Sequence, residues 1–279
     1  MTHRPVISAV QAGLTTALAG VVLAVGVTAL RQTWADPAPA TCLPVDCFCE
    51  AVRPAGLAQP VNAITSLAYV ALGVWALVGG IVVPRVDPRT TVLVRAVGAV
   101  LVVLGVGSFV YHGTLTFIGQ VLDVQGMYLL GMLIIVAALV RRGALAPRAA
   151  PWVYLVACAG LAVVQVVAPD SRRLLFALVL LPGIVFEALP STTGVDVRSP
   201  ATLPYRTGVA ALVAAYVVWV LDNAGIVCWP TSVLQGHGAW HVLTAIAAVL
   251  VVGHYARTPG RRTPPVDETT IGRQMGGSS

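Results

Sequence analysis

The sequence contains eight segments that are each long and apolar enough to cross a lipid bilayer as a helix. A spanning helix needs about 20 mostly apolar residues, because the hydrocarbon core holds no water to satisfy free backbone groups. Segments of this kind cover residues 8–30, 61–83, 92–111, 121–140, 152–168, 174–189, 205–221 and 237–255. The chain is therefore expected to fold as an all-α integral membrane protein.

Charged side chains are scarce. They make up 10% of the chain, against 57% hydrophobic residues, whereas a soluble domain carries about 25% charge. This composition excludes a soluble globular protein, which would have to expose large apolar patches to water. All 17 basic residues are arginines, scattered singly or in pairs between the apolar segments. Such scatter does not indicate a nucleic-acid-binding surface, and the absence of lysine suggests a bacterial source.

The first apolar segment stands apart from the other seven, because a polar stretch rich in Pro and Cys follows it. We expect an N-terminal signal anchor or extra transmembrane helix at 1–30 and an extracytoplasmic Cys-rich segment at 31–60. A seven-helix core domain at 61–256 and a disordered cytoplasmic tail at 257–279 follow. The first segment could instead be a cleaved signal sequence, but its apolar run is longer than a usual signal-peptide core.

The distribution of arginines indicates the orientation in the membrane. With eight spans, thirteen arginines fall in loops and tails on one side and four on the other. Loops rich in arginine face the cytoplasm. Both termini are therefore expected inside and the Cys-rich segment outside, in a multi-pass protein of the bacterial cell membrane.

Four of the five cysteines lie on the side predicted to be outside. Cys42, Cys47 and Cys49 belong to the Cys-rich segment and Cys228 to a later outer loop, whereas Cys158 falls inside a span. An oxidising compartment favours two disulfides, in one of three possible pairings. The alternative is free or metal-binding thiols, although Cys47 and Cys49 are too close in sequence to hold one zinc ion comfortably.

Polar side chains gather where the predicted spans reach the outer face: Ser108, His112, Asp123, His237 and His241. Ionisable groups in a membrane are costly, and they are functional candidates by default. His237 and His241 are four residues apart, so their imidazoles project from one face of a helix. Ser108 and His112 have the same spacing. Three neutral imidazoles with an open fourth position are the ligand set of a catalytic zinc ion.

Two further polar residues have simpler interpretations. His254 is expected to cap a carbonyl or reach the membrane interface, and Asp222 to make a structural hydrogen bond or orient a loop. A purely structural membrane protein would not need three histidines and an aspartate at one face. The metal site is therefore the favoured interpretation of that cluster.

Five short motifs follow one another along the chain: Cys49-Glu50 with Asn62 and Ser66, Ser108-x3-His112, Asp123, Trp219-x2-Asp222 with Cys228, and His237-x3-His241. Together they resemble the alkaline ceramidases, which are seven-helix zinc hydrolases. The superfamily also includes the adiponectin and progestin receptor-like proteins. The resemblance covers residues 47–255 and leaves out the first apolar segment.

The resemblance implies a role for each site residue. His112, His237 and His241 would hold zinc, Asp123 would receive a proton from the attacking water, and Ser108 would support the developing oxyanion. The implied reaction is zinc-dependent hydrolysis of the amide of a ceramide-like membrane lipid to a fatty acid and a sphingoid base. The lipid would enter from the bilayer into a cavity between the helices.

The resemblance also implies a disulfide pairing. Cys49 would pair with Cys228, and Cys42 with Cys47 would then form the second bridge.

The sequence departs from the ceramidase pattern in the stretch before the first core helix. Relatives carry a calcium site there, built largely from acidic residues, whereas this chain keeps only Asp46 and Glu50 and has Val52 and Gln59 where an asparagine and an acid are expected. Calcium binds through clustered hard oxygens. The sequence therefore does not support a calcium site or activation by calcium.

Three alternatives compete with a ceramide hydrolase. Many bacteria make no sphingolipid, so another lipid amide or ester fits the zinc chemistry equally well. A receptor-like member of the superfamily, with a structural zinc, is expected to carry a sizeable cytoplasmic domain. A transporter or channel is expected to show polar residues near mid-membrane and internal repeats. The sequence displays none of these three features, which favours the hydrolase.

Overall fold

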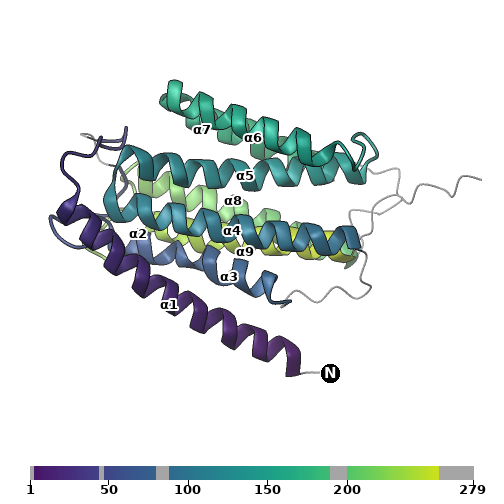
Figure 1. Ribbon diagram of the computed structural model, residues 1–279, viewed down its shortest axis with the longest axis horizontal. Coiled ribbons are helices and arrows are strands. Elements are labelled where there is room, and N and C mark those ends of the chain that lie inside the picture. Colours follow the sequence, from purple (N-terminus) through teal and green to yellow (C-terminus); the bar gives the residue numbers. More distant parts are fainter. Residues whose placement is uncertain (1–2, 44–46, 80–87, 189–199, 258–279) are drawn as a thin grey trace, which may run out of the picture.

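The computed structural model describes residues 3–43, 47–79, 88–188 and 200–257. These residues form long helices that run side by side, with α1 along one edge of the bundle and α6 and α7 along the opposite edge (Figure 1). The α-helices are α1 (His3–Thr33), α2 (Pro60–Thr65), α3 (Leu67–Leu77), α4 (Pro88–Thr114), α5 (Phe117–Arg141), α6 (Ala150–Val167), α7 (Arg172–Ala188), α8 (Leu203–Asn223) and α9 (Gly236–Arg257). Short 3-10 helices, Pro169–Ser171 and Pro200–Thr202, precede α7 and α8.

Seven stretches of the described chain are long and apolar enough to cross a membrane. They comprise α1, α2 together with α3, α4, α5, α6, α8 and α9. The remaining predicted span corresponds to α7, whose 17 residues lie at the lower end of the length that a bilayer requires. The prediction of an all-α multi-pass membrane protein is confirmed.

The second predicted span is broken near its start. The sequence predicts one helix over 61–83, whereas the structure has α2 and α3 on either side of Ser66. The Ser66 hydroxyl donates to the carbonyl of Ala63 at 2.6 Å and lies 3.3 Å from the carbonyl of Gly105 in α4. Such side-chain hydrogen bonds compete with those of the helix backbone. Hydropathy alone carries no signal for this break.

The connection between α4 and α5 is shorter than the sequence predicts. A loop is expected over 113–119, but α4 continues to Thr114 and α5 begins at Phe117. Leu115 adopts a φ of 52°, and the Thr116 side chain caps α5 by accepting the N–H of Gly119 at 3.2 Å. Threonine is a favoured capping residue. The tight turn holds the last turn of α4 against the first turn of α5.

Helices α4 and α5 pack backbone to backbone at small residues. A Cβ atom at Gly107 would lie 2.8 Å from the Leu122 carbonyl oxygen, and one at Gly126 would lie 2.7 Å from the Cα of Leu104. Close approach through glycine is a common way for helices to associate in a membrane. It brings Ser108, next to Gly107, up to α5.

The Cys-rich segment folds over one end of the bundle, where α4 ends and α5 and α9 begin; we refer to this as the capped end. Backbone hydrogen bonds join it to the α4–α5 turn, from Ala40 N–H to the Leu115 carbonyl and from Phe117 N–H to the Ala38 carbonyl. The Gln59 N–H also donates to the carbonyl of His112 at 2.9 Å. The segment is thus tied directly to the elements that carry the predicted site.

Two disulfides strengthen the capped end. Cys42 pairs with Cys47 within the segment, and Cys49 pairs with Cys228 in the connection between α8 and α9. This is the pairing that the resemblance implies. Cys158 remains a free thiol, buried in α6.

Helix α1 lies against α3 and α4. Its Val27 is buried and packs close to Gly113, next to His112. The Arg31 guanidinium donates to the carbonyls of Gly56 at 2.6 Å and Arg53 at 3.2 Å. Helix α1 therefore contacts both the core and the Cys-rich segment.

Candidate metal centre

Three histidine side chains meet at the capped end. His112 lies in the last turn of α4, and His237 and His241 lie in the first two turns of α9. All three are buried, with 0%, 6% and 2% of their surface exposed. One ligand atom from each ring lies within 4.8 Å of the others. Within the described part of the chain, these three side chains form the one group that could hold a metal ion.

The spacing of the ring nitrogens suits a tetrahedral metal ion. The Nε2 atoms of His112 and His237 are 3.1 Å apart. Two nitrogens bound to zinc at 2.0–2.1 Å with a tetrahedral angle would be about 3.3 Å apart. Neutral imidazole is a common zinc ligand. The donor set and its spacing therefore fit zinc.

Two of the rings are held from behind by hydrogen bonds. Nδ1 of His112 lies 3.1 Å from Oε1 of Gln59, and Nδ1 of His241 lies 3.1 Å from the Thr65 hydroxyl. The Thr65 hydroxyl donates to the carbonyl of Val61 at 2.8 Å, so its oxygen is left to accept from His241. Metal-binding histidines usually give their second N–H to such an acceptor. The Nε2 lone pairs are then free for a metal.

A hydroxyl and a carboxylate lie next to the imidazoles. Ser108 sits one turn before His112 on α4, and its Oγ is 3.4 Å from Nε2 of His241. The same hydroxyl interacts with the carboxylate of Asp123 on α5. Ser108 is fully buried and Asp123 is 9% exposed. The structure thus brings all five side chains singled out by the sequence into one cluster.

The sequence alone does not identify three neighbours of the histidines as part of the site. Gln59 and Thr65 provide the acceptors just described, and the Phe48 ring packs on His237 with 3.8 Å between ring centroids. Phe48 and Gln59 lie in the irregular Cys-rich segment, where no periodicity predicts which way a side chain points. The position of Gln59 next to Pro60 indicates only that a helix begins there.

Of the two residues that the ceramidase resemblance relates to a calcium site, the structure describes Glu50. Asp46 lies outside the described residues. Both carboxylate oxygens of Glu50 are engaged, because they accept the backbone N–H groups of Val61 at 2.7 Å and Asn62 at 2.8 Å. Burial also raises the pKa of Glu50, although these hydrogen bonds act in the opposite direction. Glu50 therefore serves to cap the start of α2.

Asp222 has the structural role expected of it. Its carboxylate accepts the N–H of Cys49 at 3.3 Å and the N–H of Gly236 at 2.9 Å. It thereby joins the Cys-rich segment to the first residue of α9.

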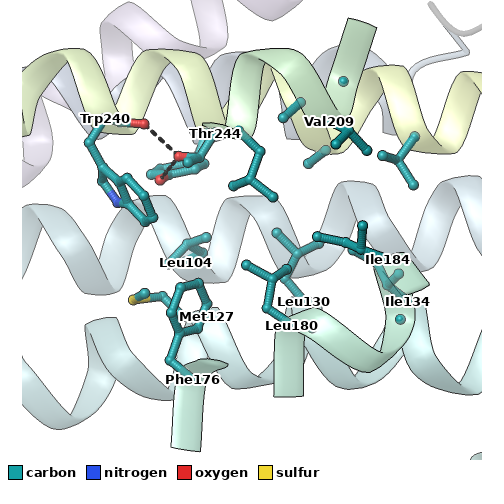
Figure 2. A pocket seen from close by; sticks show the side chains of 18 of the residues that line it. Leu104, Met127, Leu130, Ile134, Phe176, Leu180, Ile184, Val209, Trp240 and Thr244 are labelled. Atoms are coloured by element: carbon teal, nitrogen blue, oxygen red, sulfur yellow. Dashed lines mark hydrogen bonds between the residues drawn. The ribbon is translucent and has the colours of Figure 1, made fainter. Parts of the chain in front are cut away.

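An apolar pocket lies between α5, α7, α8 and α9, with Tyr69 of α3 and Leu104 of α4 also in its lining (Figure 2). Trp240 and Thr244 line it. Trp240 directly precedes His241 in the sequence, and Thr244 lies about one helical turn after it. Thr244 bonds to the hydroxyl of Tyr69, whose ring lies 5.8 Å from that of His241. At its far end the pocket reaches Ile134 and Ile184.

The pocket has the polarity of a lipid-binding site. Its lining is almost entirely apolar. Ligand pockets are lined predominantly by apolar and aromatic side chains. A hydrocarbon chain placed in it would have one end next to the histidine cluster.

Comparison with known proteins agrees with this geometry. The family model described as Ceramidase matches residues 48–265, which include all five clustered side chains and every residue that lines the pocket. A search of curated proteins gives no significant match. Because the family model covers well over half of the sequence, the chain belongs to the ceramidase family.

Proposed function

We propose that the protein is an integral-membrane, zinc-dependent hydrolase that cleaves the amide bond of ceramide-like lipids, releasing a fatty acid and a sphingoid-type amine. The observation that carries the proposal is the convergence of three buried imidazoles whose ligand atoms lie within 4.8 Å of one another. The hydrolase domain is taken to be residues 61–256.

His112, His237 and His241 would hold the zinc ion through nitrogen. When bound, zinc supplies a Lewis acid that polarises the amide carbonyl and makes a water molecule more acidic. The remaining chemistry falls to the side chains beside it. Asp123 takes the proton from the attacking water and passes it to the departing amine nitrogen. Water thus provides the hydroxyl of the fatty acid and the hydrogen of the amine.

Ser108 is suited to stabilise charge on the reacting oxygen. Its hydroxyl lies between the metal-facing nitrogen of His241 and the carboxylate of Asp123. A donor placed where negative charge develops contributes most when water is excluded, and Ser108 is fully buried. We assign Ser108 the role of donor to the carbonyl oxygen.

The pocket supports a lipid substrate. Its walls include Trp240 and Thr244, on either side of His241 in the sequence, and continue between the helices, so an acyl chain in the pocket would place its carbonyl near the histidines. The same geometry accommodates an acyl ester or another acyl amide. The acyl chain is the part of the substrate that the pocket selects.

We place the site at the extracytoplasmic face of the membrane. Both disulfides lie at the capped end, and disulfides persist in oxidising compartments. The C-terminus would then lie in the cytoplasm, on the side that holds most of the arginines.

The test is fatty-acid release by the purified protein in detergent. Ceramides, other long-chain amides and the matching esters are offered before chelation, after chelation and after zinc is restored. We expect release from ceramide-like amides that stops on chelation and returns with zinc. The variant His254→Gln serves as a control, because His254 lies about 20 Å along α9 from His241. Stoichiometric zinc without turnover of any substrate would favour a receptor-like function and overturn the proposal.

A further inference from the structure

We propose that Gln59 is a positioning residue that fixes the orientation and tautomer of His112, so that Nε2 of this ring faces the metal. The inference rests on the proposed function, because it assigns a task toward the metal that His112 would hold. Gln59 is not itself a metal ligand, since its amide is occupied by protein partners.

Gln59 is hydrogen-bonded to His112 through both its backbone and its side chain. Its N–H donates to the carbonyl of His112 at 2.9 Å, while its Oε1 lies 3.1 Å from Nδ1 of the His112 ring. Its Nε2 donates to the carbonyl of Glu50 at 2.9 Å. The side chain is fully buried. Two hydrogen bonds therefore hold the side-chain amide in a single orientation, and the third joins the backbone of Gln59 to that of His112.

The contact with Glu50 decides which atom of the amide faces His112. Only the NH2 group can donate to the carbonyl of Glu50, so the oxygen of the amide must face the ring. An oxygen there accepts only from a protonated Nδ1. A neutral His112 ring therefore carries its proton on Nδ1 and presents the Nε2 lone pair to His237, 3.1 Å away.

The three histidines differ in this support. His241 has an acceptor in Thr65, on α2. Nδ1 of His237 is buried without a hydrogen-bond partner among the described residues. Of the two hydrogen bonds to Nδ1 atoms of these rings among the described residues, the one from Gln59 is the one that comes from the Cys-rich segment. The position of the Cys-rich segment therefore affects the orientation of His112, because the Glu50 carbonyl holds the Gln59 amide that contacts the ring.

The experiment compares three full-length variants with the wild-type protein. Zinc affinity is measured by competition with a chelator, and the melting temperature is measured on each metal-free protein. Gln59→Met removes both side-chain hydrogen bonds at similar volume. Gln59→Glu keeps an acceptor for His112 and loses the donor to Glu50. Gln165→Met is the matched control, because Gln165 is 3% exposed and its amide donates to Gln125, on α5.

We expect Gln59→Met to lose about 10- to 100-fold in zinc affinity, the usual effect of removing a partner of a metal-binding histidine. Gln59→Glu should keep the wild-type affinity within about threefold, even if its melting temperature falls, because a carboxylate is also a good acceptor for the ring N–H. Gln165→Met should leave zinc affinity unchanged.

Two results would overturn the inference while leaving the proposed function intact. One is wild-type zinc affinity in Gln59→Met. The other is an equal loss in Gln59→Met and Gln59→Glu, which would mean that Gln59 merely braces the segment. Failure of the wild-type protein to bind zinc would instead remove the proposed function, and the inference with it.

Discussion

Helix α9 carries buried histidines near both of its ends, and their surroundings differ. At the capped end, His241 meets two further imidazoles, a hydroxyl and an acceptor for its second nitrogen. At the opposite end, His254 is equally buried, with 3% exposed, but it packs against the rings of Tyr205 and Tyr255. Burial alone therefore does not identify a metal ligand. The convergence of several donors does.

The largest effect is expected from removing one of the converging donors. His241→Ala should leave far less than one zinc per chain and reduce fatty-acid release by several orders of magnitude, because two imidazoles no longer close the site. Metal analysis and product release are measured on the same preparation. His254→Gln should keep both. Normal hydrolysis by His241→Ala would show that the histidine cluster at the capped end does not hold the catalytic metal.

The next effect separates metal binding from proton transfer at the capped end. Asp123→Asn keeps the shape of the side chain but loses its basicity, so we expect turnover to fall by about 10²–10⁴-fold. Zinc content should stay at the wild-type level, since Asp123 is not among the three clustered ligands. Zinc analysis and single-turnover rates test this, and an unchanged rate would exclude Asp123 as the proton acceptor.

The two disulfides provide a comparison within the capped end itself. Cys49 and Cys228 are 179 residues apart in sequence, whereas Cys42 and Cys47 are five apart. A bridge that closes a longer loop is expected to stabilise more, within a typical range of about 2–4 kcal/mol. Thermal unfolding of the two double Cys→Ser variants measures the difference. The variant that lacks the Cys49–Cys228 bridge should lose more stability, and equal losses would mean that this bridge stabilises the protein no more than the local one.

The smallest effect is expected at the far end of the pocket. Ile184→Trp should shorten the space for an acyl chain, and we expect long-chain substrates to lose about tenfold relative to short ones. Zinc content should not change. Leu155→Trp is the matched control, because Leu155 is 56% exposed and lies outside the pocket lining. If both variants keep the wild-type ratio of long- to short-chain turnover, the pocket does not hold the acyl chain.

Hydropathy and helical spacing predict the parts of this molecule that repeat a simple physical pattern. The spans follow from the length of apolar runs, and the pairing of His237 with His241 follows from the helical repeat. The position of His112 and Asp123 beside a short turn brings α4 and α5 into the same cluster. These features depend on local periodicity and on the thickness of the membrane.

The features that were missed depend on contacts between distant segments. At the break between α2 and α3, the Ser66 hydroxyl contacts the carbonyl of Gly105 on α4, 39 residues away in sequence. The interaction of Gln59 with His112 requires the Cys-rich segment to fold back on the bundle, and this segment has no repeat to indicate its course. The partners of the histidines could therefore be found only from the structure.

Zinc K-edge X-ray absorption on the purified, zinc-loaded protein tests the central claim most directly. The account predicts about one zinc per chain, with imidazole nitrogen ligands at 2.0–2.1 Å and no sulfur at about 2.3 Å. The signal should be lost in His241→Ala and kept in His254→Gln. Zinc bound through sulfur, or a histidine-ligated signal that persists in His241→Ala, would contradict a centre built from His112, His237 and His241.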